Sequence, residues 1–405
     1  MTAPTAVAAP PQLDARAWVL VDGRTGEVLA GREANRAAPV ASATKLMTAY
    51  LALRELPLRR TVRAAPYAAI PAESLLGLSA GEKVSVRDLL YGLILRSGND
   101  AAHTLAVAVS GSDGRFVRDM NLRAAALGLS QTHYSNPIGL DEPGNYSSAG
   151  DLVALSRRLL DIPAFARLAG SRRAVLRSLR PRRTIVTRNT LLFRAPWTTG
   201  VKTGHTLGAG YVLVGAGRRK GVELVSAVLG APSETERDLA TIALLDYGFS
   251  LYRQRRPLRA GEELATPEVR YSGGELPLRA ARGVTVGVRR GQELNVRVDA
   301  PEEVEGPVAR GRVLGSAVVY VDGGRAAEVD LVASRSLPTA STFDKARSFV
   351  EENLAAFAVG GFVILIAGVF LRRRRHRTKD EEVERLRREE RRAARESERV
   401  GGSRR

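Results

Sequence analysis

A serine and a lysine three residues apart are the first candidates for chemistry in this sequence. Ser42 and Lys45 lie in the stretch PVASATKLMTAYLAL, in which Leu46, Tyr50 and Leu53 recur at helical spacing. Because positions i and i+3 share one face of a helix, the Lys45 amine can reach the Ser42 hydroxyl. Only six residues of the chain are lysine, so composition gives little reason for one here. The pair predicts a serine nucleophile with an amine base, a role that arginine cannot take because it stays protonated.

Two further motifs follow along the chain. The first is the SGN triplet at Ser97–Asn99, after the apolar run of LILRSGNDAA, and the second is the KTG triplet at Lys202–Gly204, just before a hairpin pattern. A Ser-x-x-Lys match is expected about 0.4 times by chance in this length, and a Lys-Thr-Gly triplet only about 0.03 times. The three motifs in this order therefore carry far more weight than the first one alone.

The three motifs correspond to the S-x-x-K, S-D-N and K-T-G signature of class A β-lactamases and penicillin-binding proteins. With their flanks they resemble the D-alanyl-D-alanine carboxypeptidases of the low-molecular-mass penicillin-binding protein family. The likeness covers about residues 17 to 255 and is carried by TGEVLAGREANRAAPVASATKLMTAY, SGNDAAHTLA, MNLRAAALGLSQTHYSNPIGLD and GVKTGHTLGAGYVLV. The later stretch VEGPVARGRVLGSAVVYVDG is similar to the β-rich domain that follows the catalytic domain in that family. One departure is Val40-Ala41, where the family usually has Pro-Ala.

The resemblance implies catalytic roles for Ser42, Lys45 and Ser97 and a substrate-binding role for Asn99. Ser42 would be the acylated nucleophile and Lys45 its base, kept neutral by burial and by a neighbouring cation, Lys202. Ser97 would relay a proton to the departing D-alanine amine. Asn99 would hydrogen-bond the substrate amide and Lys45.

The resemblance also implies residues that bind the substrate. Lys202 and Thr203 would hold the terminal carboxylate, and Gly204 would let backbone and substrate approach closely. The backbone N–H groups of Ser42 and His205 would form the oxyanion hole, with no necessary part for the His205 side chain.

Arg188, in VTRNTLLF, is a further candidate for the carboxylate site, because family members often carry a polar residue there. A surface arginine at a strand edge is the alternative. Tyr134, Ser135 and Asn136 are interpreted as loop structure and not as catalytic residues.

The elements around the motifs predict an α+β fold. WVLVDGRTGEVLAG and YVLVGAGRRKGVELVSAVLG have the pattern of hairpins, and SETERDLATIALLDYGF predicts an amphipathic helix opened by Ser233 with Glu236 in capping-box spacing. The prediction is a β-lactamase/transpeptidase-like catalytic domain over 13–255, an antiparallel sheet with a helical cluster and the active site between them. Short glycine-separated β-runs predict a small all-β domain over 256–336.

The two ends of the chain suggest targeting and anchoring. Residues 1–12 lack a basic region and an apolar region, so we interpret them as the remnant of an incomplete signal peptide. After a predicted linker at 337–353, residues 354–371 carry no charge and predict a transmembrane helix. The arginine block that follows predicts a charged cytoplasmic tail over 372–405 and an extracytoplasmic catalytic domain at the cell membrane.

Composition excludes several other classes of function. The net charge of +19 is spread thinly outside the tail, so we expect no nucleic-acid partner. The chain has no cysteine, and its four histidines form no ligand-spaced cluster, so we expect neither a metal nor a cofactor.

The predicted function is removal of the terminal D-alanine from peptidoglycan stem pentapeptides through an acyl-enzyme on Ser42, with β-lactams as acylating inhibitors. A D,D-endopeptidase that cuts crosslinks is the nearest alternative, and a non-catalytic wall-binding scaffold is another. A β-lactamase is disfavoured because Glu142 is the only glutamate between Asn99 and Lys202, and its context DEPGN does not match the pattern of the deacylating glutamate.

Overall fold

The computed structural model describes residues 9–71 and 73–401, and within this range it leaves the side chains of 355–358, 374–382 and 393–401 undescribed. Residues 1–8 of the predicted N-terminal remnant lie outside the described residues. The chain divides into two compact units. The first unit contains residues 1–259, 283–297 and 318–328, and the second contains 260–282, 298–317 and 329–405.

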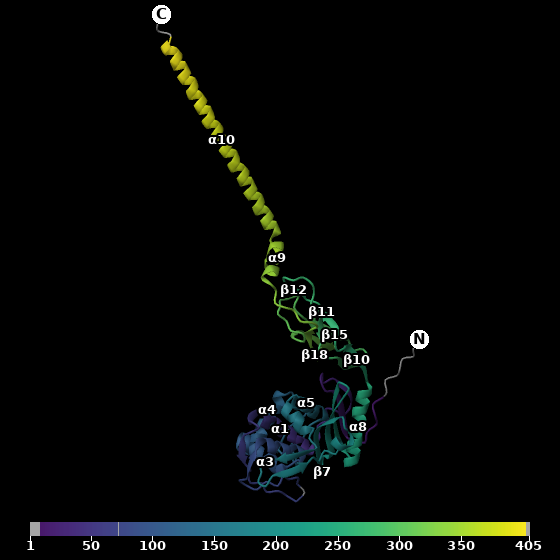
Figure 1. Cartoon of the computed structure of the whole chain (residues 1–405). Helices are drawn as coiled ribbons and strands as arrows, with labels where there is room; N and C mark the ends of the chain where they lie inside the picture. The colour runs from purple at the N-terminus through teal and green to yellow at the C-terminus, as the bar shows by residue number, and fades with distance from the viewer. Residues whose placement is uncertain (1–8, 72, 402–405) are drawn as a thin grey trace, which may run out of the picture. The chain divides into compact units, whose positions relative to one another are not determined.

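A five-stranded antiparallel sheet is the centre of the first unit (Figure 1). Its strand order is β2 (Val28–Arg32), β1 (Ala17–Asp22), β9 (Val222–Ala231), β8 (Gly210–Arg219) and β7 (Thr198–Thr206). The two hairpins predicted from the sequence are β1–β2 and β8–β9. Because β7 is an edge strand, every second backbone group along it faces away from the sheet. The KTG triplet lies on this open edge.

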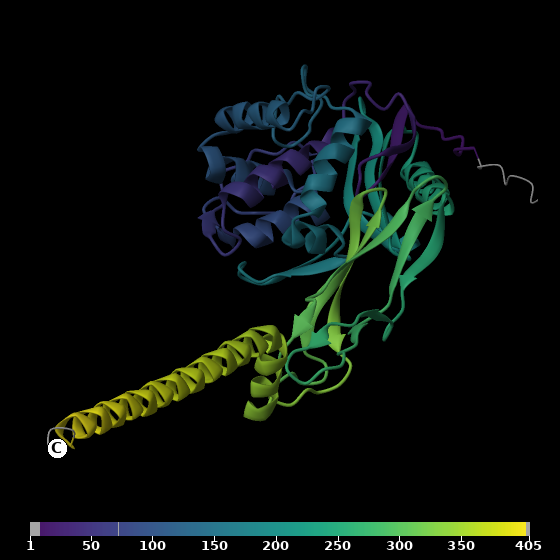
Figure 2. The same ribbon diagram turned by 90° about the horizontal axis from the view of Figure 1, so that it is seen from above.

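Both faces of the sheet are covered, and strand β1 shows why. Ala17, Val19 and Val21 pack into a core shared with the helical cluster, whereas Trp18 and Leu20 pack into a second core beneath α8 (Glu234–Ser250). The whole strand is buried, as expected where helices lie on both sides of a sheet. Figure 2 shows the helical cluster and α8 on opposite faces.

The helical cluster follows the first hairpin in the chain. A 3₁₀ turn, η1 (Ala41–Thr44), leads directly into α1 (Lys45–Glu55). The other helices of the cluster are α2 (Val86–Leu95), α3 (Asn99–Ser110), α4 (Asp113–Ala126), α5 (Ala149–Leu160) and α6 (Pro163–Ala169). The first unit also contains short elements: β3 (Thr61–Arg63), β4 (Lys83–Ser85), β5 (Arg173–Leu176), β6 (Arg183–Val186) and α7 (Leu191–Arg194).

Helix α8 begins as its sequence predicts. The Ser233 side chain accepts a hydrogen bond of 3.1 Å from the backbone N–H of Glu236, which satisfies a donor that the first turn leaves unpaired. The apolar side chains of this helix complete the second core of the sheet. The predicted α+β class and the antiparallel sheet with its helical cluster are therefore confirmed.

The remainder of the chain is rich in β-strands up to about residue 333. The strands are β10 (Tyr252–Leu258), β11 (Glu263–Ala265), β12 (Glu268–Val269), β13 (Leu278–Ala280), β14 (Val284–Arg289), β15 (Leu294–Asp299), β16 (Glu303–Val304), β17 (Val313–Val321) and β18 (Gly324–Ala333). Five of them form one sheet in the order β11-β13-β18-β17-β15.

The C-terminal segment is more helical than the sequence predicts. The predicted linker contains α9 (Thr342–Glu352), opened by a capping box in which the Ser341 and Asp344 side chains bond each other's backbone N–H groups. Helix α10 then spans Leu354–Gly401. Within the described part of the chain, no helix has the combination of length and apolarity needed to cross a bilayer, and residues 355–358 of the predicted span lie outside the described side chains. The structure does not support the predicted transmembrane helix.

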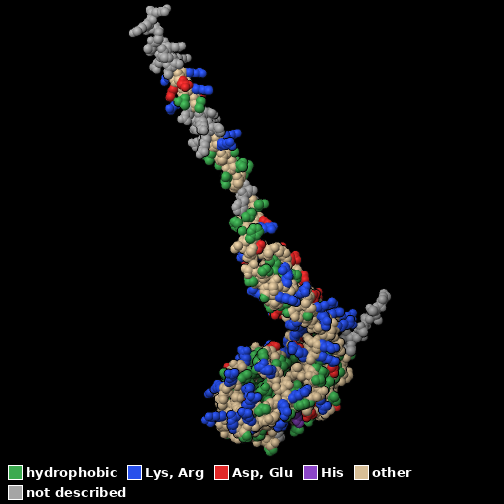
Figure 3. Space-filling view, viewed as in Figure 1, with side chains coloured by type: hydrophobic (Ala, Val, Ile, Leu, Met, Phe, Trp, Pro, Cys, Tyr) green, Lys and Arg blue, Asp and Glu red, His purple; other side chains and the backbone are tan. Residues whose placement is uncertain are grey.

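Basic side chains are scattered over the molecular face shown in Figure 3 and do not line a single groove there. This distribution matches the diffuse arginine excess of the sequence. The same view shows hydrophobic side chains gathered along the first part of α10.

Candidate active site

The candidate nucleophile lies in a tightly enclosed turn. Ser42 is half-buried between the buried residues Ala41 and Ala43, and Ala41 has a positive φ of 49°. A Cβ added at Gly204 would lie 3.0 Å from the Ser42 backbone nitrogen, and one at Gly139 would lie 2.1 Å from the Ala41 carbonyl oxygen. Two other segments therefore press their backbones against the turn, which only glycine permits. Gly204 was expected to admit the substrate, and the structure shows that it admits the nucleophile turn itself.

Lys45 is the first residue of α1 and is completely buried. Its Nζ atom donates to Ser42 Oγ at 2.8 Å and also donates to the backbone carbonyl of Ile138. Burial lowers the pKa of the amine to about 7, while the negative charges of Glu73 and Asp100 act in the opposite direction. A large fraction of this lysine is therefore neutral near pH 7 and able to accept a proton.

The second motif and the third motif meet at a single hydrogen bond. Lys202 Nζ, from β7, donates to Ser97 Oγ at 3.0 Å and to the Thr203 carbonyl at 2.6 Å. Ser97 has a φ of 60°, an uncommon conformation for a residue with a side chain, held between α2 and α3. Burial, followed by the charges of Lys45 and Arg188, lowers the pKa of Lys202. An anionic group bound beside Lys202 would favour its charged form again.

The role of Lys202 in keeping Lys45 neutral stays a prediction. Burial is the largest cause of the low pKa of Lys45, and the charge of Lys45 contributes to the low pKa of Lys202. In addition, the Asn99 side chain was expected to contact Lys45, and its Nδ2 atom instead donates to Glu73 Oε2 at 2.6 Å.

Arg188 and His205 occupy different positions relative to the site. The Arg188 guanidinium donates to Ser74 Oγ, and its charge contributes to the low pKa of Lys202, so it lies near the third motif. The His205 side chain is exposed and stacks on Tyr211 of β8 with ring centroids 4.1 Å apart. Its side chain therefore packs on the neighbouring strand β8 and not on the Ser42–Lys45 pair. The oxyanion-hole role of its backbone stays a prediction.

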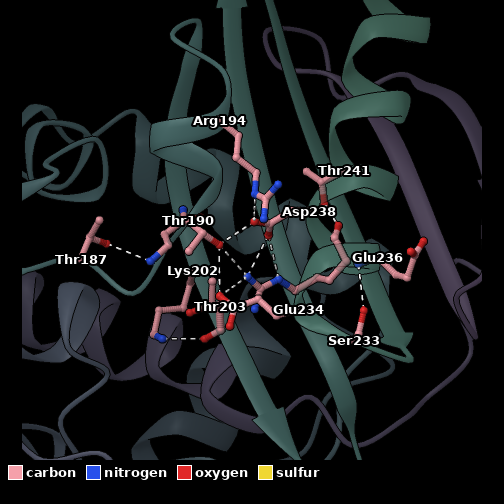
Figure 4. A network of polar contacts seen from close by, with 12 residues as sticks. Thr187, Thr190, Arg194, Lys202, Thr203, Ser233, Glu234, Glu236, Asp238 and Thr241 are labelled. Carbon is pink, nitrogen blue, oxygen red and sulfur yellow. Dashed lines mark hydrogen bonds and ion pairs between the residues drawn. The ribbon is translucent and has the colours of Figure 1, made fainter.

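A buried polar network lies beside the third motif (Figure 4). Asp238, on α8, accepts a hydrogen bond from the adjacent Arg237 at 2.8 Å and another from Thr190 Oγ1 at 2.5 Å. It also forms an ion pair of 3.1 Å with Arg194. Thr190 follows Arg188 by two residues, so this network fixes the segment that carries Arg188. The charge of Arg237 also contributes to the low pKa of Lys202.

Three contributions to the site have no motif in the sequence. The Ile138 carbonyl belongs to a loop in which Asn136 Oδ1 accepts from the backbone N–H groups of Ile138 and Gly139, at 3.2 and 2.7 Å. This loop role fits the interpretation of residues 134–136 as structural. Glu73 comes from a segment without a recognisable pattern. Asp238 comes from a helix that the sequence predicts, but no motif marks this aspartate, and only its burial in the folded chain reveals the network around it.

Comparisons with known proteins agree with this geometry. The profile of the family described as "D-alanyl-D-alanine carboxypeptidase" matches residues 4–233, and that of "penicillin-binding protein 5, C-terminal domain" matches residues 252–339. The D-alanyl-D-alanine carboxypeptidase DacF of Bacillus subtilis is 30% identical over 81% of this chain and 87% of its own length. The D-alanyl-D-alanine carboxypeptidase DacC of Escherichia coli is 32% identical over 86% of this chain and 92% of its own length.

Solved structures give the same result. The structure of penicillin-binding protein 5 from Haemophilus influenzae, 30% identical in sequence, covers 82% of this chain and 99% of its own length with a TM-score of 0.58. A Streptomyces DD-transpeptidase, 29% identical, covers 60% of this chain and all of its own length with a TM-score of 0.57. With the serine, the lysines and the third motif in one site, the chain belongs to the D-alanyl-D-alanine carboxypeptidase family of penicillin-binding serine peptidases.

Proposed function

We propose that this chain removes the terminal D-alanine from peptidoglycan stem pentapeptides and that Ser42 and Lys45 carry out the reaction. The observation that carries the proposal is the 2.8 Å hydrogen bond between Lys45 Nζ and Ser42 Oγ, made by an amine whose pKa burial lowers to about 7. Such a group meets the requirements of a general base near neutral pH, in both geometry and proton affinity. The names of the relatives supply the substrate class.

Acylation begins when Lys45 takes the proton of Ser42 and the hydroxyl oxygen attacks the carbonyl carbon of the penultimate D-alanine. Backbone N–H groups of Ser42 and His205 would stabilise the resulting oxyanion. The bond to the terminal D-alanine then breaks, and its amine receives, through the Ser97 hydroxyl, the proton that Lys45 took from Ser42, so that Lys45 becomes neutral again. The Ser97 hydroxyl is hydrogen-bonded to Lys202. The products of this step are free D-alanine and an ester on Ser42.

Deacylation uses the same base. Lys45 takes a proton from water, the hydroxide attacks the ester carbonyl, and the proton returns to Ser42 Oγ as the shortened peptide leaves. β-Lactams enter the same first step as acylating inhibitors.

The positive side chains near the third motif fit the terminal carboxylate of the substrate. Lys202 and Thr203 would hold it from β7, and Arg188 would add a second positive charge. Burial makes the charged form of the Lys202 amine unfavourable when it has no partner. An ion pair with the substrate carboxylate would stabilise that charged form.

Release of D-alanine from diacyl-L-Lys-D-Ala-D-Ala by the full chain in detergent micelles tests the proposal. We expect release by the parent chain and by Lys83→Arg, an exchange at an exposed lysine of β4, and none by Ser42→Ala or Lys45→Arg. Full activity of Lys45→Arg would contradict the assignment of the base. If penicillin acylates the parent but no D-alanine appears, cleavage of crosslinked muropeptide dimers would instead identify the D,D-endopeptidase.

We propose in addition that the apolar segment 354–371 holds the chain at the cell membrane, with the catalytic domain outside and the tail inside. Its exposed apolar side chains and the arginine block after it support this. Flotation with liposomes tests it: the full chain should float and a chain ending at Asn353 should not. Equal sedimentation of both chains would rule out the anchor.

A further inference from the structure

Residues 136–141 form a loop whose two ends are fixed by side chains, and we call it the base loop. At its start, Asn136 Oδ1 accepts hydrogen bonds from the backbone N–H groups two and three positions ahead, at 3.2 and 2.7 Å. At its end, Asp141 accepts from Thr206 Oγ1 at 2.7 Å and from the Gly208 backbone N–H at 2.9 Å, which ties the loop to the turn after β7. The loop is therefore held on both sides of its middle residues.

The middle of the base loop turns two consecutive carbonyl groups toward one face of α1. Thr48 Oγ1 donates to the Pro137 carbonyl at 2.7 Å, and Lys45 Nζ donates to the Ile138 carbonyl. Lys45 and Thr48 are three positions apart on the helix, so their side chains lie on the same face. Both residues are completely buried. The threonine and the candidate base thus bind neighbouring groups of one short backbone segment.

The Thr48 hydroxyl holds a carbonyl that is difficult to satisfy in another way. Proline has no backbone N–H, so its carbonyl is the one backbone group of Pro137 that can form a hydrogen bond. Pro137 is buried, so loss of the hydroxyl would leave this oxygen away from water without its donor. The loop would then gain from moving toward a new donor. Because the peptide group is planar, a rotation of the Pro137 carbonyl also displaces Ile138.

The Ile138 carbonyl restricts how the Lys45 amine can turn. A neutral amine carries two N–H groups and one lone pair, and it accepts a proton only through the lone pair. A carbonyl oxygen only accepts hydrogen bonds, so an N–H group must face it and the lone pair cannot. The lone pair is then left to the remaining directions of the nitrogen, one of which leads to Ser42 Oγ at 2.8 Å.

We infer that Thr48 is a positioning residue that holds the base loop against α1, so that the Ile138 carbonyl keeps the Lys45 amine oriented toward Ser42. The inference rests on the proposed function, in which neutral Lys45 takes the Ser42 proton. Thr48 itself does not touch the reacting atoms. It acts through the Pro137 carbonyl on the carbonyl that follows.

A purely structural role for the Thr48 hydroxyl has a different consequence. In that case its loss would lower the stability of the fold and leave the acylation rate of the folded protein unchanged. If Thr48 positions the base, acylation slows in protein that is fully folded. Stability and rate measured on the same variants separate the two.

The experiment measures the second-order rate of acylation by a fluorescent penicillin, with the full chain in micelles, from about pH 5.5 to about pH 9. Thr48→Val replaces the hydroxyl by a methyl group of similar size, Thr48→Ala removes it without adding a group, and Thr48→Ser keeps it. The control is Thr241→Val on α8, which removes another completely buried hydroxyl that donates to a backbone carbonyl, that of Arg237 at 2.8 Å.

The high-pH plateau of the rate should fall roughly tenfold in Thr48→Val and in Thr48→Ala, because both leave the Pro137 carbonyl without its donor. Thr48→Ser should stay within about threefold of the parent, since its hydroxyl can reach the same oxygen. Thr241→Val should match the parent.

Two further readouts separate positioning from stability. The midpoint of the acid limb should stay at about pH 7 in Thr48→Val, because the valine fills the same space and Lys45 remains buried. Urea titration should show a similar loss of stability for Thr48→Val and Thr241→Val, although only the first loses acylation rate.

Three results would overturn the inference: an unchanged plateau in Thr48→Ala, a fall in Thr48→Ser as large as in Thr48→Val, or an equal fall in Thr241→Val. A midpoint that moves while the plateau stays would also contradict it, because Thr48 would then act through the burial of Lys45. If the parent shows no Ser42-dependent acylation, the proposed function fails instead.

Discussion

The buried position of Lys45 leads to a quantitative pH dependence of acylation. The base must be neutral to accept the Ser42 proton, and burial lowers its pKa to about 7. The neutral fraction is then about one tenth at pH 6, about one half at pH 7 and about nine tenths at pH 8. Acylation by a fluorescent penicillin should therefore rise about tenfold from pH 6 to pH 8 and level off above, provided that proton transfer to Lys45 limits the rate.

The comparison with an unperturbed lysine gives the size of the effect of burial. With an ordinary pKa of about 10.4, only about one lysine in 2,500 would be neutral at pH 7. The enclosed position at the start of α1 thus increases the amount of active base about a thousandfold. Lys45→Arg should abolish acylation at every pH, because the guanidinium does not deprotonate in this range.

Stopped-flow measurement of the acylation rate across this pH range provides the assay, and Lys83→Arg is the matched control. The control should reproduce the parent profile. A flat profile between pH 6 and pH 8, or an acid limb that persists in Lys45→Arg, would refute the argument that the Lys45 amine is the titrating base.

Three further predictions follow from the packing around the site. Gly204→Ala should slow acylation roughly tenfold to a hundredfold, because its Cβ would lie 3.0 Å from the Ser42 backbone nitrogen; an unchanged acylation rate would show that the turn can move away. Asp100→Ala should lower the free energy of unfolding by about 2–3 kcal/mol, since the backbone N–H groups of Leu76, Gly77 and Leu78 lose a charged acceptor, and urea titration measures this. Asp238→Ala should cost about 3–5 kcal/mol in the same assay, because Arg237 stays buried without its nearest carboxylate, and a loss below 1 kcal/mol would contradict this.

The parts of the site that could be predicted from sequence are those that depend on local spacing. Ser42 and Lys45 meet because they are three positions apart across the junction of η1 and α1. The lysine of the third motif could be assigned only through the resemblance, because no local rule brings β7 to the segment between α2 and α3. In the structure β7 is an edge strand of the sheet, and its Lys202 donates a hydrogen bond to Ser97 between α2 and α3.

Other features depend on packing that a linear pattern does not encode. Glu73 lies between β3 and β4, close to Leu76, whose backbone N–H is hydrogen-bonded to Asp100, and its carboxylate accepts a hydrogen bond from Asn99. Asp238 is one of many acidic residues on amphipathic helices, and its complete burial becomes evident only in the folded chain. The predicted linker was assigned from its composition, although Ser341 and Asp344 already have the capping-box spacing that opens α9.

The pairing of β1 with β9 has a consequence for how this chain folds. Val19 pairs with Ala227, so the sheet closes only when segments roughly 200 residues apart have met, a contact that raises contact order and slows folding. The nucleophile turn follows the early hairpin, but the strand that presses against it, β7, comes much later in the chain. A nascent chain interrupted before Val222 lacks the strand that lies between β1 and β8. Covalent labelling by penicillin should therefore report completed synthesis of the sheet, appearing late and all at once.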